Sequence, residues 1–191
     1  MASKIILVTG GARSGKSRFA EQYVAKHGRE IAYIATAQIY DDEMKLRVAL
    51  HKNRRPSEWT TYESPYNAEH AIMSASKKHD TILFDCLTLY TSNMLFAKSA
   101  PQKITERYEY VKEHIEILLK AAKESKRQIV FVTNEVGMSI VPENALAREY
   151  RDLAGLVNQS IAATADEVYM VISGIAVDIK KISTKLEEEY V

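Results

Sequence analysis

The chain has 191 residues, of which 46% are hydrophobic and 27% charged, and its formal net charge is +1. This composition is typical of a globular protein and lacks the basic excess of general nucleic-acid binders, so we expect no nucleic-acid partner. One cysteine excludes a disulfide framework, and no apolar run is long enough for a membrane span, so we expect a soluble, cytoplasmic protein.

Five short apolar runs predict β-strands, and they lie at residues 4–9, 30–36, 80–85, 128–133 and 167–173. The runs are continuous rather than alternating, which is typical of strands covered on both faces. Apolar residues at spacings of three and four predict helices between them, over residues 104–122 and, just after Pro142, over 146–161. Alternating strands and helices indicate an α/β fold, with a mostly parallel sheet flanked by helices on both faces.

No linker or repeat divides the sequence, so we predict a single domain over residues 1–191. Residues 37–66 stand outside the alternation of strand and helix. Three acids at residues 41–43 predict the start of a short helix there, because a helix dipole favours negative charge in its first turn. We therefore expect a helix-containing excursion over residues 37–66. The tail at residues 185–190 reads as a solvated end or a short helix.

The sequence GGARSGKS at residues 10–17 matches the phosphate-loop (P-loop) pattern, between a predicted strand and a helix-compatible stretch. Glycines let backbone N–H groups surround a phosphate, and the helix N-terminus adds its positive dipole end. Lys16 can reach the terminal phosphates, and the Ser17 hydroxyl can ligate Mg²⁺. We therefore expect nucleoside triphosphate binding and a P-loop NTPase-like (RecA-like) fold. The expected phosphate-binding residues are Gly10, Gly11, Ala12, Arg13, Ser14, Gly15, Lys16 and Ser17, although Arg13 could equally point into solvent.

Asp85 ends a predicted strand and is the candidate second ligand of Mg²⁺ beside Ser17. The alternative is that Asp85 caps the following helix. Ligands of open α/β sheets bind at the carboxyl ends of the strands, so we expect Thr36, Asp85, Asn134 and Glu135 to converge near the P-loop.

A histidine lies within a basic stretch, where His51 is surrounded by Arg47, Lys52, Arg54 and Arg55. One interpretation is a helix whose cationic C-terminus complements its dipole. The other is a nucleophile inside a phosphate clamp, which requires a neutral imidazole. A reference pKa of about 6.5 and the neighbouring cations favour the neutral form, whereas a helix C-terminus opposes it. Sequence alone leaves both interpretations open.

Four stretches carry a resemblance that covers nearly the whole chain: ILVTGGARSGKS, YIATAQIYDDEMKLRVALHKNRRPSEW, VTNEVGMSIVPENALAREYRDLAGLVNQ and ADEVYMVISGI. They resemble the bifunctional adenosylcobinamide kinase/adenosylcobinamide-phosphate guanylyltransferase family of cobalamin biosynthesis. The P-loop is shared by many families. The blocks DDEM…R…HK…RP..W and TNEVG…VPEN…R..RD..G..NQ are much more specific.

The resemblance implies two reactions. Adenosylcobinamide would be phosphorylated by a nucleoside triphosphate, with ATP and GTP both open as donors. GMP would then pass from GTP to adenosylcobinamide phosphate through a covalent GMP–histidine intermediate, whose position maps onto His51. Some relatives carry a second histidine just before it, where this chain has Leu50.

The resemblance also implies further site residues and an assembly. The expected contacts to the guanine nucleotide are Ala35, Thr36, Ala37, Lys52, Asn53, Arg54, Arg55, Glu63 and Asp85. The family is typically a homotrimer with active sites near subunit boundaries, so residues 37–66 could complete a neighbouring site. Trp59 and the pair Leu95–Phe96 could anchor such an interface or simply pack in the core.

Two other functions fit part of the sequence. A monofunctional P-loop small-molecule kinase would use the P-loop and Asp85 but leave His51 without a role. A nucleotide-binding switch would bind without turnover. For the kinase step, Glu135 is the candidate general base.

Overall fold

The computed structural model describes residues 3–184, and in one helix it describes the backbone but not the side chains of residues 47, 50, 51, 53 and 54. The predicted tail at residues 185–190 lies outside this range.

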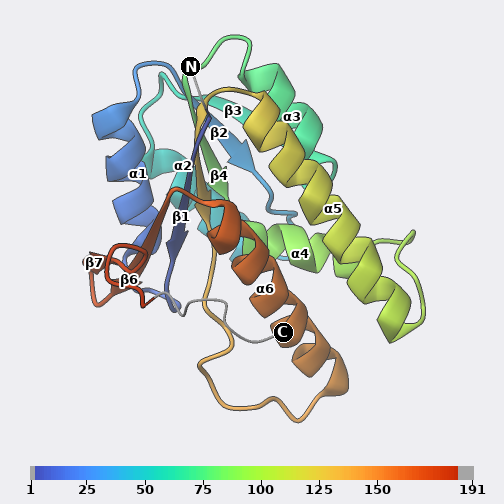
Figure 1. Cartoon of the computed structure of the whole chain (residues 1–191). Helices are drawn as coiled ribbons and strands as arrows, with labels where there is room; N and C mark the ends of the chain where they lie inside the picture. The colour runs from blue at the N-terminus through green and yellow to red at the C-terminus, as the bar shows by residue number, and fades with distance from the viewer. Residues whose placement is uncertain (1–2, 185–191) are drawn as a thin grey trace, which may run out of the picture.

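Within the described range, seven strands form one sheet in the order β3-β2-β4-β5-β1-β6-β7 (Figure 1). Neighbouring strands are parallel except for β7, which is antiparallel to β6. The strands are β1 (Lys4–Thr9), β2 (Ile31–Ala35), β3 (Thr60–Glu63), β4 (Thr81–Asp85), β5 (Gln128–Val132), β6 (Glu167–Ile172) and β7 (Ile175–Asp178). The five predicted strands are confirmed to within one residue at each end, whereas β3 and β7 were not predicted.

Helices cover both faces of this sheet, as predicted. They are α1 (Lys16–His27), α2 (Asp42–Arg54), α3 (Ala68–Ala75), α4 (Leu87–Leu95), α5 (Ile104–Glu124) and α6 (Ala145–Thr164). Alternate residues of β1 enter different cores: Ile6 packs in a cluster with Val24 of α1, and Leu7 packs in a cluster with Ile115 of α5. Helix α1 therefore lies on one face, and α3, α4, α5 and α6 lie on the other (Figure 1).

The predicted excursion contains a helix, but part of it belongs to the sheet. Asp41 is the N-cap of α2, and its Oδ1 accepts a 2.7 Å hydrogen bond from the Met44 N–H. Residues 60–63 then form the edge strand β3, parallel to β2. The stretch that stands outside the sheet is therefore shorter than residues 37–66.

Two predicted helix starts need correction. Helix α6 begins at Ala145 because the Asn144 side chain caps it by accepting from the Ala147 N–H, so Pro142 lies before the helix rather than in its first turn. The N-cap position of α4 is Cys86, and Asp85 does not cap that helix.

The suggested interface anchors differ in exposure. Leu95 is buried in the core on the α5 face of the sheet, Trp59 packs partly exposed against the core on the α1 face, and Phe96 is 59% exposed. Across the described residues, the helices are too short or too polar to cross a membrane.

Candidate active site

The P-loop connects β1 to α1, and two of its glycines are required by backbone geometry. Gly10 has a φ of 155°, and a Cβ there would collide with the Val171 carbonyl oxygen. Gly15 has a φ of 95°, and a Cβ would lie 3.1 Å from the Cα of Gly174. Gly174 belongs to the β6–β7 turn, and its N–H donates to the Ser14 carbonyl oxygen at 2.8 Å. The turn after β6 therefore packs against the P-loop and holds its backbone in place.

The interior of the loop suits an anion. Gly15 occupies the N-cap of α1 without a capping side chain, which leaves the dipole end of the helix facing the loop. The Ser14 hydroxyl is buried and has no hydrogen-bond partner among the described residues. A phosphate oxygen bound in the loop would satisfy such a group. Arg13, by contrast, is exposed at the tip of the loop with a φ of 57°.

Lys16 lies across this loop, and its Nζ donates to the Gly11 carbonyl oxygen at 3.2 Å. Burial lowers the pKa of the Lys16 ammonium below its usual value, and the nearby Cys86 and Asp85 side chains oppose that shift. The ammonium is thus partly desolvated beside a carboxylate. Its attraction to phosphate oxygens is stronger there than it would be in bulk water.

Predicted nucleotide contacts form a row across the carboxyl edge of the sheet. Ala35 at the end of β2 is in register with Glu63 of β3 on one side and with Asp85 of β4 on the other. The Thr36 N–H donates to the Asp85 carbonyl oxygen, and the Thr36 hydroxyl bonds both backbone groups of Cys86. The Thr36 side chain is fully buried, and these hydrogen bonds fix the backbone position of Asp85.

Tyr33 connects Asp85 to the end of the helix that carries His51. The Tyr33 hydroxyl donates to Asp85 Oδ2 at 2.8 Å, and the Arg55 guanidinium lies 3.5 Å from the centre of the Tyr33 ring. Burial and the neighbouring Asp85 raise the pKa of the Tyr33 phenol, which keeps the hydroxyl protonated as a donor. Arg55 is the C-cap residue of α2. The basic end of this helix therefore reaches the acid beside the P-loop.

The His51 backbone lies in the last turn of α2, as predicted. The side chains of His51, Asn53 and Arg54 lie outside the described residues, and Lys52 is exposed.

Asn134 and Glu135 approach the P-loop from β5. The Glu135 N–H donates to the Gly10 carbonyl oxygen at 3.1 Å, and Glu135 Oε1 accepts from the Gly137 N–H at 3.1 Å. The Asn134 N–H donates to Thr88 Oγ1 at 2.8 Å. Of the four residues expected to converge near the loop, Glu135 contacts it and Asp85 lies near Lys16, whereas Thr36 and Asn134 bond to Cys86 and Thr88 at the start of α4.

Ser17 and Asp85 supply a hydroxyl and a carboxylate, the hard oxygen ligands that Mg²⁺ prefers. This donor set fits a cation that is shared between the protein and the phosphates of a bound nucleotide, since Mg²⁺ commonly keeps only one or two protein ligands.

Sequence reasoning missed Tyr33 and the turn after β6. Tyr33 lies inside an apolar run and has the appearance of a core residue. The Ser-Gly pair at residues 173–174 is a recognised hairpin-turn signal and could have revealed β7.

Comparison with known proteins places the chain in a family. Residues 6–179 match the family model described as cobinamide kinase / cobinamide phosphate guanyltransferase. The bifunctional adenosylcobalamin biosynthesis protein CobU of Salmonella typhimurium LT2 is 47% identical over 182 residues, covering 92% of this chain and 99% of that protein. CobU of Escherichia coli K12 is 43% identical with the same coverage, and CobP of Pseudomonas aeruginosa is 38% identical, covering 91% of this chain and 96% of that protein.

A solved structure supports the fold alone. An ATPase from the type III secretion system of pathogenic bacteria aligns with a TM-score of 0.55 at 11% identity, covering 98% of this chain and 60% of that one. The fold is thus RecA-like, as the sequence predicts. The chain belongs to the cobinamide kinase / cobinamide phosphate guanyltransferase family.

Proposed function

We propose that this protein phosphorylates adenosylcobinamide and then transfers GMP from GTP to the product, giving adenosylcobinamide-GDP and pyrophosphate. Beyond family membership, one observation carries the proposal. Arg55 is the C-cap of the helix that bears His51 and stacks on Tyr33, and Tyr33 donates to Asp85 beside the P-loop. A nucleophile on α2 and a phosphate site on the P-loop can therefore serve the same nucleotide.

In the kinase step, the substrate hydroxyl oxygen attacks the γ-phosphorus, the bond from that phosphorus to the bridging oxygen breaks, and a nucleoside diphosphate leaves. Lys16 and the P-loop N–H groups stabilise the transferred phosphoryl group. Ser17 and Asp85 would hold Mg²⁺, which supplies charge neutralisation when bound. Glu135 is the candidate acceptor of the hydroxyl proton, because it lies directly beside Gly10. Either ATP or GTP can serve as donor in this scheme.

In the transferase step, a ring nitrogen of His51 attacks the α-phosphorus of GTP, and pyrophosphate leaves as the phosphorus–nitrogen bond forms. A phosphate oxygen of adenosylcobinamide phosphate then attacks the same phosphorus and displaces the histidine. Two displacements replace one, which is the general advantage of a covalent intermediate. Lys52, Arg54 and Arg55 would hold the departing pyrophosphate.

We further propose a cytoplasmic homotrimer in which the excursion meets a neighbouring subunit. Its support is the exposure of apolar side chains on this segment: Ile39 is 56% exposed, Tyr40 72% and Leu46 61%. Several exposed apolar side chains within one segment are typical of contact surfaces.

The test is product analysis by mass spectrometry after incubation with adenosylcobinamide, ATP, GTP and Mg²⁺. Wild type is expected to give adenosylcobinamide-GDP, and His51→Ala is expected to stop at adenosylcobinamide phosphate. His70→Ala is the matched control, because His70 is 82% exposed on α3, and it should behave as wild type. Wild type that stops at the phosphate would instead identify a monofunctional kinase.

A further inference from the structure

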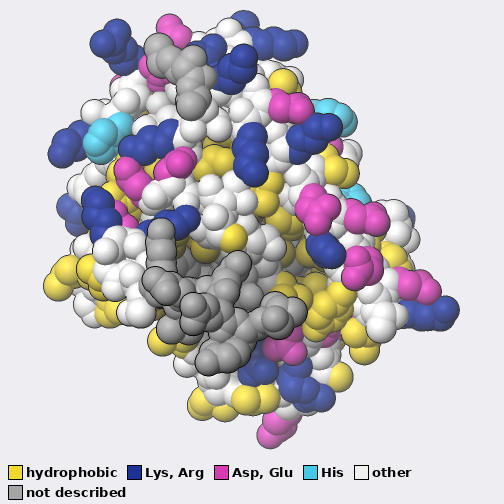
Figure 2. Space-filling model, viewed as in Figure 1, with side chains coloured by type: hydrophobic (Ala, Val, Ile, Leu, Met, Phe, Trp, Pro, Cys, Tyr) yellow, Lys and Arg dark blue, Asp and Glu magenta, His cyan; other side chains and the backbone are white. Residues whose placement is uncertain are grey.

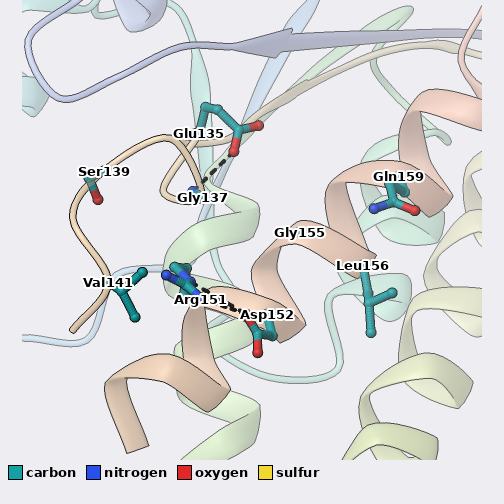
Figure 3. A pocket seen from close by; sticks show the side chains of 9 residues that line it. All are labelled: Glu135, Gly137, Ser139, Val141, Arg151, Asp152, Gly155, Leu156 and Gln159. Atoms are coloured by element: carbon teal, nitrogen blue, oxygen red, sulfur yellow. Dashed lines mark hydrogen bonds and ion pairs between the residues drawn. The ribbon is translucent and has the colours of Figure 1, made fainter. Parts of the chain in front are cut away.

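An open cavity of about 550 Å³ lies between the loop that follows β5 and the middle of α6 (Figure 3). Glu135, Gly137 and Val141 line it from the loop, and Gly155 and Leu156 line it from the helix. None of the nucleotide-binding residues predicted above lines this cavity. Its volume is within the range of small-molecule sites in proteins.

The cavity borders the P-loop. Glu135 forms its inner wall, and the Glu135 N–H is bonded to the Gly10 carbonyl oxygen. The start of the loop is rigidly held, because Asn134 bonds to Thr88 on α4 and to Asn158 on α6. A molecule bound here would reach the phosphates in the P-loop with one end while its body stayed outside.

Apolar side chains around the cavity are exposed within the part of the chain that the structure describes. Val141 is 61% exposed and Leu156 45%, and on the same loop Met138 is 78% and Ile140 92% exposed. Figure 2 shows hydrophobic side chains gathered along this lower edge of the molecule. Exposed apolar groups in such a number, next to polar ones, mark a binding surface.

Gly155 gives an independent indication. It lies in the interior of α6, where glycine is less favourable than alanine. A Cβ at this position would meet no described atom within 4 Å, and the backbone there has no positive φ. Neither packing nor conformation within the described chain requires a glycine. Its effect is to leave the helix backbone open to a flat group that approaches from the cavity.

From these features we propose that the cavity binds the corrin ring of the cobinamide substrate, a proposal that rests on the function proposed above. A corrin is a broad, largely apolar ring whose edge carries neutral amides. Val141, Leu156 and the bare backbone at Gly155 suit its face. The polar groups on the same wall suit its amides, and they are Gln159 and the ion pair of Arg151 with Asp152 (Figure 3). The substrate's reacting group would then lie beside Glu135.

The test compares Gly155→Leu with Ala163→Leu, which adds the same side chain to an exposed position of α6 that does not line the cavity. For Gly155→Leu we expect the KM for adenosylcobinamide in the kinase reaction to rise about tenfold or more. The reason is that the added side chain would occupy the space proposed for the face of the corrin. The KM for the nucleotide and labelling of the protein by GTP, which needs no corrinoid, should stay as in wild type. Ala163→Leu should change none of these.

Gly155→Ala provides a second variant, because it should stabilise the fold and yet weaken substrate binding, so that unfolding cannot explain the effect. Alanine should raise the Tm by favouring the helix and should still weaken corrinoid binding. An unchanged KM for adenosylcobinamide in both Gly155 variants, with wild type active, would overturn the corrin site alone. If the Gly155 variants changed the sedimentation behaviour with that KM unchanged, the cavity would be a subunit interface instead. Wild type without turnover on adenosylcobinamide would remove the proposed function and this site with it.

Discussion

The contact between Tyr33 and Asp85 leads to a prediction about the proposed Mg²⁺ site. Tyr33→Phe removes a 2.8 Å hydrogen bond to Asp85 Oδ2 and leaves the buried ring in place beneath Arg55. A hydrogen bond to a charged group contributes about 1.5–3 kcal/mol. Asp85 is only half-buried, so water can replace part of the interaction. We therefore expect the lost hydrogen-bond free energy to lie near the lower end of that range.

The hydrogen bond would orient the Asp85 carboxylate toward the metal, so its loss should weaken Mg²⁺ binding. A loss of about 1.4 kcal/mol corresponds to a tenfold rise in the Mg²⁺ concentration for half-maximal activity. The assay is kinase activity titrated with Mg²⁺ at saturating nucleotide and corrinoid. Tyr150→Phe is the matched control, because the Tyr150 hydroxyl donates to the Thr88 carbonyl oxygen and does not contact Asp85. A Mg²⁺ requirement that stayed at the wild-type value in Tyr33→Phe would refute a positioning role for Tyr33.

Three further predictions concern the P-loop and the stability of the fold. Gly10→Ala should lower the Tm and abolish nucleotide binding in a calorimetric titration, because the new methyl collides with Val171; wild-type affinity would contradict the loop geometry. Lys16→Ala should reduce both reactions by about a hundredfold or more while leaving the Tm equal or higher, because burial disfavours the charged ammonium; a large loss of Tm would contradict this. Glu167 is hydrogen-bonded by one lysine and two tyrosines, and although burial opposes the shift, these bonds lower its pKa from 4.5 to about 2. The stability gained from this carboxylate is complete above pH 4.5 and is lost as the pH falls toward 2, so the Tm difference between wild type and Glu167→Gln should shrink over that interval; a difference independent of pH would count against it.

The central strands could be predicted because both their faces are covered, which produces continuous apolar runs such as TILFD in β4. The edge strand β3 has the sequence TTYE and is mostly exposed, so no such run marks it. Its place in the sheet depends on pairing with β2, which is a tertiary contact. The short helix α3 was missed for a similar reason, since eight residues carry too little periodicity to stand out.

The site was predictable where function requires a fixed local pattern, as in the P-loop, or a residue at a strand end, as for Asp85. Contacts between distant elements were not. Tyr33 belongs to β2 and Arg55 to the end of α2, and only the folded chain stacks one on the other. The cavity beside α6 is lined largely by residues of the block TNEVG…VPEN…R..RD..G..NQ, but their spacing in the sequence does not show that they surround one cavity.

The central claim is that His51 becomes covalently attached to GMP during guanylyl transfer. The most direct measurement is intact and peptide mass after incubation with GTP labelled at the α-phosphorus and Mg²⁺, for wild type and His51→Ala. We predict an acid-labile, base-stable GMP adduct on the peptide that contains His51 in wild type, and none in the variant. Formation of adenosylcobinamide-GDP by a protein that never carries this adduct would contradict the covalent route.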